Sequence, residues 1–308
     1  MEKYPRIKIF VAHHKPWYVY EDDVYVPIQV WKKKLAIDLW IIWDDTWDNI
    51  SEKNANYAEL TAQYWVWKNY DLRDVDYVWF CHYRRYMTYC YEPNIFNYIF
   101  AKNFYSPFEN VSHLFWKWIA LKENHCLMKY NQNKLKNNSE WVKEYIQNTK
   151  YDLYMPKKVL YLKWKILSKI WKKMPPPMNF CWFSEENKLF IESINLFYEK
   201  YPEQVRILKI LENQWSEYFW RGRHMFIMRK NLYLQYMERL FGYLFELEKL
   251  IEEKHLDITM HWAGKYDWRF MWIFSESLIN YWIERMRKRE SIKVSSDANT
   301  LMFTDYYL

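Results

Sequence analysis

The segment "HYRRY", His82 to Tyr86, sets two arginines and a histidine between aromatic residues at the end of an apolar run. If that run is a strand, Arg84 and Arg85 point to opposite sides of it. One guanidinium could then hold a diphosphate through paired hydrogen bonds while the other forms a structural ion pair. His82 is a candidate general base. This segment is the strongest candidate for a ligand site in the sequence.

A second basic segment, "AHHKP", follows the first apolar run "RIKIFVAHH". His13 and Lys15 could line a nucleotide pocket, because lysine binds phosphate as a point charge. The alternative is a solvated loop, where histidine and lysine are common. The residues fit both a nucleotide pocket and a solvated loop.

Carboxylates gather in "IIWDDTWDNISEKN" and just beyond it. Asp44, Asp45 and Asp48 could act as a base toward an acceptor hydroxyl, or could bond to their own backbone as turn residues. Glu59 lies three residues after Asn56, which is the spacing of a capping box at a helix start. We therefore favour a capping role for Glu59 over a catalytic one.

The elements that position these residues alternate between strand and helix. "RIKIFVAHH" and "DYVWFCHYRRYMTY" are typical of strands. Between them, "NANYAELTAQYWVWKNY" predicts a helix with Leu60, Tyr64 and Trp67 on one face. Polar residues at strand ends indicate an open α/β sheet, in which ligands bind beyond the carboxyl ends of the strands.

The rest of the chain predicts mostly helices. We expect one domain over residues 1–295, sheet-rich over 1–160 and helix-rich over 161–295, with a loose tail at 296–308. "KWKILSKIWKK" could lie on an anionic membrane surface or form a solvated basic helix. The four cysteines form no CxxC pair, so we expect reduced, mostly buried thiols.

Composition sets limits on partners and location. The formal net charge of +7 favours anionic partners such as nucleotide phosphates. The sequence shows no charged-then-apolar leader and no run near the ~18 apolar residues of a membrane span. We expect a cytoplasmic protein.

Glycine is scarce and tryptophan abundant. Glycine usually makes up ~7% of a chain, which would be about 21 residues here, yet the sequence has 3 glycines and 20 tryptophans. Trp43 and Trp47 stand in a polar turn where glycine would be expected. The pattern indicates that many tryptophans occupy glycine positions.

Four segments, in order, resemble a known family: "VAHHKP", "YVPIQV", "DDTWDNISEKNANYAELTAQYWVWKN" and "DYVWFCHYRRY". The sequence is similar to bacterial exopolysaccharide and capsule biosynthesis proteins, catalogued as a domain of unknown function and regarded as glycosyltransferases. The resemblance covers most of the chain. It implies a single open sheet of the nucleotide-diphospho-sugar-transferase type (GT-A-like), with flanking helices and a helix-rich C-terminal half.

The family pattern has glycine at five positions where this sequence has tryptophan: Trp31, Trp43, Trp47, Trp79 and Trp272. Trp65 and Trp67 are tryptophan in both. UGA encodes glycine in some bacteria and tryptophan under other codes. We therefore interpret the excess of tryptophan as glycine codons translated with the wrong table.

The resemblance implies that the chain moves a sugar from a nucleotide-sugar donor to a surface-polysaccharide or lipid-linked acceptor. Peripheral contact with the inner membrane face is an open alternative to a purely cytoplasmic location. The expected donor-binding residues are His13, Lys15, Asn49, Arg84 and Arg85. The base would be one of Asp44, Asp45, Asp48, Glu59 and His82.

Many related transferases hold a divalent metal in an Asp-x-Asp motif where this sequence has "HYRRY", which lacks the oxygen ligands Mg²⁺ prefers. Asp74 and Asp76 precede the strand, and His255, Asp257 and His261 lack a ligand spacing. We expect no metal-binding residues and no firm cofactor, with arginines offsetting the charge of the diphosphate. A divalent metal stays open as an alternative that no Asp-x-Asp motif supports.

Two other functions remain open. Basic charge with 22% aromatic residues is typical of single-stranded nucleic-acid binders, although the excess tryptophans weaken that signal and we expect no nucleic-acid partner. An inactive scaffold in polysaccharide assembly is the other alternative.

Overall fold

A computed structural model of the chain describes most of both ends and part of the middle. The described residues are 4–35, 37–88, 125–128, 131–156, single positions between 192 and 202, 226–256, 260–262, 265–267 and 270–303.

Four parallel strands form the part of the sheet that carries the predicted site. They are β1 (Ile7–His13), β2 (Tyr25–Gln29), β3 (Ile42–Trp43) and β4 (Tyr77–His82), in the order β3-β2-β1-β4. β1 and β2 are almost entirely buried. Strands covered on both faces are typical of an α/β sheet.

The sheet continues beyond β4 with antiparallel and parallel pairs. β5 (Arg85–Thr88) and β8 (Phe226–Arg229) both pair antiparallel with β4, which brings segments far apart in sequence to one strand. β6 (His125–Met128), β7 (Leu153–Pro156) and β11 (Val294–Phe303) complete this sheet, which has nine strands in the described residues. β9 (Met260–Trp262) pairs separately with β10 (Lys265–Asp267).

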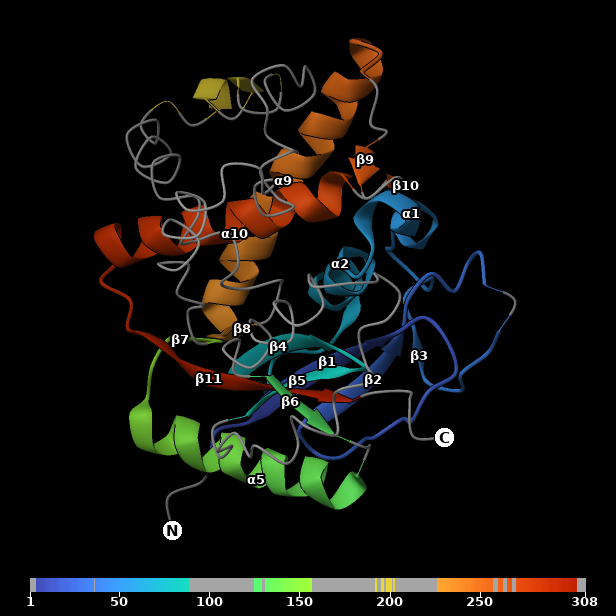
Figure 1. The fold of residues 1–308 in the computed structure, drawn as a ribbon. Coiled ribbons are helices and arrows are strands. Elements are labelled where there is room, and N and C mark those ends of the chain that lie inside the picture. Colours follow the sequence, from blue (N-terminus) through green and yellow to red (C-terminus); the bar gives the residue numbers. More distant parts are fainter. Residues whose placement is uncertain are drawn as a thin grey trace, which may run out of the picture.

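Helices cover both faces of the sheet (Figure 1). α5 (Gln132–Thr149) lies on one face. On the other lie α2 (Leu60–Asn69), α9 (Lys230–Glu253) and α10 (Phe270–Arg289), with the short η1 (Ser51–Lys53) and α1 (Asn54–Tyr57) beside them.

Aromatic contacts form the core between the sheet and the upper helices. Phe10 of β1 contacts Phe80 of β4 and Tyr70 after α2, with ring centroids 5.3 and 4.8 Å apart. Phe80 also stacks on Tyr233 of α9 at 5.8 Å. These contacts hold β1 and β4 side by side and so place their carboxyl ends together.

The α/β sheet with flanking helices is confirmed, but two local predictions fail. The expected tail from residue 296 is instead part of β11 (Val294–Phe303), which pairs with β5, β6 and β7. The helix expected from Asn56 is broken at Ala58, which has a φ of 45°. Asn56 accepts a hydrogen bond from the Met271 backbone N–H, and Glu59 makes no capping bond to α2, so the capping box does not form.

Three tryptophans have a backbone conformation that favours glycine. Trp31, Trp40 and Trp47 have φ values of 63°, 57° and 49°. Positive φ is uncommon for a bulky residue because its Cβ crowds the backbone. Trp43 and Trp79, by contrast, lie in strands β3 and β4.

No helix in the described ranges is both long and apolar enough to cross a bilayer. The basic stretch 163–173 lies outside these ranges, so the predicted membrane contact remains a prediction.

Candidate active site

The carboxyl ends of β1 and β4 meet where the strand order reverses. β2 and β3 lie on one side of β1, while β4 lies on the other. Ala12 pairs with His82, and the Tyr83 N–H donates to the Ala12 carbonyl at 3.2 Å. Open α/β sheets bind ligands in the crevice at such a switch point.

Four rings gather at this switch point, and we call them the His-Tyr cluster: His13, His14, His82 and Tyr83. The Tyr83 ring centroid lies 4.2 Å from that of His82, 5.2 Å from that of His14 and 5.5 Å from that of His13. His14 and His82 lie 5.5 Å apart. The tight connection after β4 therefore makes Tyr83 the centre of the cluster.

Three basic residues flank this cluster. Lys15 Nζ lies 5.9 Å from the Tyr83 ring centroid, and Arg84 Cζ lies 5.2 Å from it. Arg85 begins β5, opposite His82. All three basic side chains are half-buried, which leaves part of each open to solvent. Positive charge beside partly buried rings suits an anionic ligand with a flat base.

Burial keeps His13 and His82 of the cluster neutral near pH 7. It lowers the pKa of His13 to about 4, helped by the neighbouring His14. Burial also lowers the pKa of His82 well below its ordinary value, with Arg85 adding to the effect. A neutral imidazole can accept a proton or donate a neutral hydrogen bond.

His13 is buried without a polar partner among the described residues. Its side chain is fully enclosed, and neither ring nitrogen bonds to the described part of the chain. Buried polar groups are normally satisfied, so this imidazole is a group that an ordered internal water could complete.

Asp44 lies in a second, neighbouring site and is fully buried. Its carboxylate accepts from Thr61 Oγ1 at 2.6 Å, Ser51 Oγ at 2.7 Å, and the backbone N–H groups of Trp31 and Lys32 at 3.1 and 3.2 Å. Burial raises the pKa of Asp44, and these hydrogen bonds oppose that shift. Because its oxygens accept these four hydrogen bonds, Asp44 holds three segments of the chain together. It does not face solvent as a base would.

The loop after β3 carries the other acidic candidates. Asp48 is exposed, and its Oδ1 accepts from the Tyr64 hydroxyl at 2.9 Å. Burial and this contact raise the pKa of Tyr64 to about 12. Asn49 uses its amide on the loop itself, donating to the Asp45 and Trp47 carbonyls at 3.0 Å each. Asp45 is half-buried.

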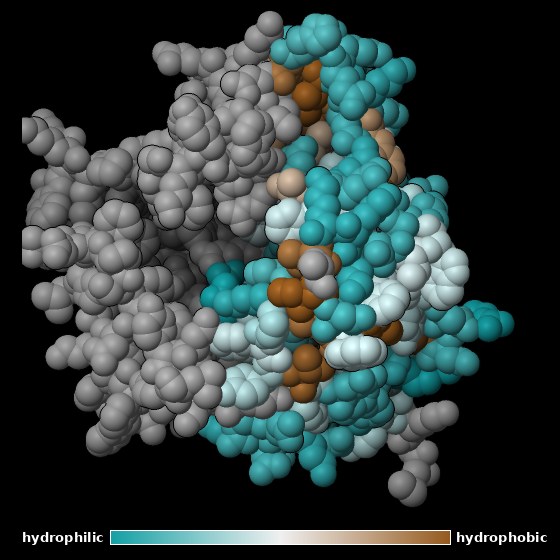
Figure 2. All heavy atoms as spheres, turned by 90° about the vertical axis from the view of Figure 1, so that its right-hand side faces the viewer, coloured by the Kyte–Doolittle hydropathy of each residue, from teal (hydrophilic) through white to brown (hydrophobic). Residues whose placement is uncertain are grey.

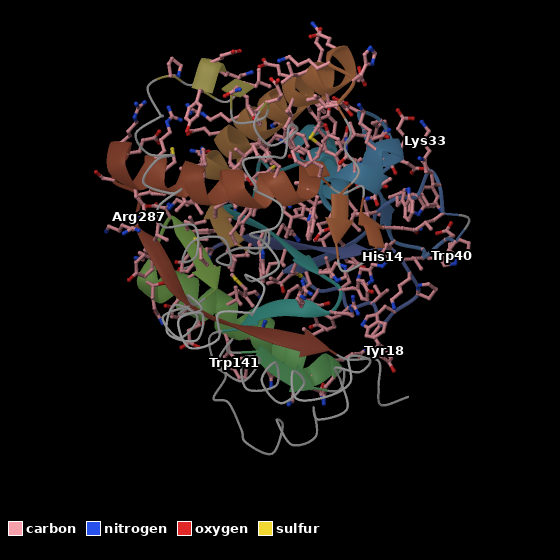
Figure 3. All side chains as sticks on the ribbon, turned by 45° about the horizontal axis from the view of Figure 1, so that its top comes forward. His14, Tyr18, Lys33, Trp40, Trp141 and Arg287 are labelled. Atoms are coloured by element: carbon pink, nitrogen blue, oxygen red, sulfur yellow. The ribbon has the colours of Figure 1, made fainter. Side chains whose placement is uncertain are left out.

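The two sites share one edge of the sheet. Gln29 pairs with His13 on one side and with Trp43 on the other. Neighbouring strands are about 4.8 Å apart, so the loop after Trp43 begins roughly 10 Å from the His-Tyr cluster. Figure 3 shows His14 on the same side of the molecule as Trp40, far from Arg287.

Of the predicted residues, the structure brings His13, Lys15, His82, Arg84 and Arg85 to one place. Asp44, Asp45, Asp48 and Asn49 lie in the neighbouring loop, and Glu59 precedes α2. Sequence reasoning missed His14 and Tyr83. Their positions beside His13 and His82, within "AHHKP" and "HYRRY", were the available signal.

Among the described residues, no three His, Cys, Asp or Glu side chains are placed to hold a metal ion. Cys81 is a buried free thiol whose pKa is raised by burial. The side chains of the other cysteines, and Asp257, lie outside the described residues.

Comparison with known sequences gives the family. Residues 8–288 match the family described as a domain of unknown function, DUF4422. The chain belongs to this family. No curated protein matches the DUF4422 chain significantly.

One solved structure shares the fold. It is the apo structure of WbbM, a bifunctional glycosyltransferase, which aligns with a TM-score of 0.70 at 23% identity. The alignment covers 97% of the DUF4422 chain and 45% of WbbM, so this chain spans less than half of that protein. The likeness supports the predicted GT-A-like fold.

Proposed function

We propose that this DUF4422 protein is a glycosyltransferase that uses a nucleotide-sugar donor and a surface-polysaccharide or lipid-linked glycan acceptor. One observation carries the proposal: cations flank a buried aromatic cluster at the switch point of a sheet that has the fold of a glycosyltransferase.

The donor would bind across the His-Tyr cluster. Lys15, Arg84 and Arg85 would face its diphosphate, where their charge offsets the negative charge of the leaving group. The enclosed imidazole of His13 would lie beneath the donor and stay neutral, because burial disfavours its protonation. This arrangement uses no Asp-x-Asp metal.

Transfer requires a base for the acceptor hydroxyl. The base takes the proton, the acceptor oxygen bonds to the anomeric carbon, and the bond from that carbon to the diphosphate oxygen breaks. His82 lies in the cluster, is neutral near pH 7 and is not fully enclosed. We therefore favour His82, with the more open Asp45 and Asp48 as the alternatives on the neighbouring loop.

A thermal-shift screen of nucleoside diphosphates and nucleotide sugars tests donor binding. A ligand at about 100 times its Kd stabilises the native state by about 2.7 kcal/mol, or roughly 5 °C for a chain of this size. Arg84→Ala should abolish the shift. Arg73→Ala is the matched control, since Arg73 is exposed and bonded to Asp71 away from the cluster.

Two outcomes would contradict the proposal. One is the absence of a shift with every nucleotide tested. The other is a steeply salt-dependent affinity for oligonucleotides without nucleotide-sugar binding, which would favour the nucleic-acid alternative.

We also propose that the functional protein carries glycine where this sequence has Trp31, Trp43, Trp47, Trp79 and Trp272. The positive φ of Trp31 and Trp47 supports glycine at those two positions. The fully buried Trp79 has no hydrogen-bond partner for its indole N–H among the described residues. The coding sequence is the test, since UGG codons at Trp43 and Trp47 would contradict a misread UGA.

A further inference from the structure

Trp47 lies over the ring of Trp65. Their ring centroids are 6.1 Å apart and the planes differ by 20°, an offset stack. Trp47 is 78% exposed and has a φ of 49°, while Trp65 is buried. The Trp47 side chain therefore shields Trp65 from water, and it does so from a strained backbone position.

The Trp65 ring is also held by hydrogen bonds that do not involve the Trp47 side chain. Its indole Nε1 donates to the Thr46 carbonyl at 3.1 Å and to Thr46 Oγ1 at 2.9 Å. Its backbone carbonyl accepts from Asn69. With glycine at position 47, the ring would keep this orientation and one of its faces would open to solvent.

Asp48 follows Trp47 and lies near Trp65, because the Asn69 amide donates to the backbone carbonyls of both Asp48 and Trp65. Asp48 is exposed, and Tyr64 and Asn69 hold it in place: the Tyr64 hydroxyl donates to its carboxylate, and the Asn69 amide donates to its backbone carbonyl at 2.8 Å. An aromatic face beside an ordered carboxylate is the chemistry that binds a sugar, whose C–H face stacks on the ring while its hydroxyls donate to the oxygen atoms.

The surrounding surface suits a polar ligand. Figure 2 looks at the side of the molecule that carries β3, and the described part of that face is mostly hydrophilic, with apolar residues in a narrow band. The loop also lies on the same edge of the sheet as the His-Tyr cluster.

We propose that the Trp65 face beneath position 47, together with Asp48, is a binding site for one neutral sugar unit of the acceptor, and that glycine at position 47 opens it. The inference rests on the proposed function, because the acceptor is taken to be a glycan. It places the acceptor on the β3 side of the donor.

Saturation-transfer NMR can test the site with three probes: methyl β-glucopyranoside, methyl β-galactopyranoside and methyl α-mannopyranoside. Trp47→Gly should bind at least one probe through its C–H protons, and the unaltered chain should not. Trp40→Gly is the matched control, since Trp40 also has positive φ and is 88% exposed. It should relieve a similar strain and leave Trp65 covered.

Adding Trp65→Leu to Trp47→Gly should weaken binding about tenfold, the loss expected for one aromatic contact. Adding the milder Trp65→Phe should retain part of the affinity and guards against a folding defect. Equal binding by the unaltered chain, Trp40→Gly and Trp47→Gly would overturn the proposal, as would no binding by any of them.

The donor screen separates the two proposals. If nucleotide sugars stabilise Trp47→Gly but no glycoside binds it, the acceptor site is wrong and the glycosyltransferase proposal stands. If glycosides bind and no nucleotide does, the Trp65 face binds sugar without a role in transfer.

Discussion

Trp65 and Trp47 lie stacked on each other, yet their surroundings differ in every other respect. Trp65 is on helix α2, is buried and has both an indole hydrogen bond and ordinary helical backbone. Trp47 is in a turn, is mostly exposed and has positive φ. The buried helical position of Trp65 suits a tryptophan, whereas the backbone of Trp47 has a conformation that favours glycine. Trp31 resembles Trp47, because its φ is positive and its buried indole N–H has no partner in the described ranges.

Replacing Trp65 should give the largest loss of stability. Trp65→Ala removes a buried ring and its hydrogen bond, so the free energy of unfolding should fall by about 3–5 kcal/mol. Urea unfolding measures this. If Trp65→Ala costs no more than Trp47→Ala, the two tryptophans do not belong to different classes.

His13 extends the comparison to a buried polar group without a partner. Its pKa is about 4 in the folded protein against an ordinary value near 6.5. Between pH 4 and 6.5 the unfolded chain therefore binds more protons than the folded chain. The stability that neutral His13 contributes is complete above about pH 6.5 and is lost as the pH falls toward 4. The loss should reach about 3 kcal/mol.

Urea unfolding at a series of pH values measures the His13 effect. His13→Gln cannot titrate and should reduce the slope between pH 6.5 and 4, while the lowered pKa of His82 keeps part of it. An unchanged slope in His13→Gln would assign the effect to other groups.

Asp44 shows how the strained turn at Trp31 is held. Asp44→Ala would leave two hydroxyl and two backbone donors without their acceptor. The cost should be about 3 kcal/mol. Asp45→Ala, in the neighbouring position, should cost much less in the same unfolding experiment. Equal costs would show that the buried carboxylate does not hold the loop together.

Replacing an exposed tryptophan that has positive φ by glycine should have the smallest effect and the opposite sign. Trp40→Gly should raise the free energy of unfolding by about 1 kcal/mol, because the left-handed backbone strains tryptophan and not glycine. A loss of stability would mean that the Trp40 side chain contributes more than its strain costs.

The sequence predicted much of the candidate site because strand ends carry recognisable residues. "AHHKP" and "HYRRY" each follow a β-branched, apolar run, so their place at one sheet edge followed from the pattern. The capping box failed for a tertiary reason: the Asn56 side chain accepts a hydrogen bond from Met271, which lies 215 residues away. Strand β11 was missed because its register depends on partners in β5, β6 and β7.

Sequence alone determined the α/β class, the two basic strand ends and the suspect tryptophans, since each depends on local pattern or composition. Only the tertiary structure showed that Asp44 is buried and Asp48 is exposed. The first is enclosed by four donors from three segments, and the second stays in solvent. Neighbouring carboxylates look alike in a sequence, whereas burial and hydrogen-bond partners are properties of the packed chain and decide which of them can meet a substrate.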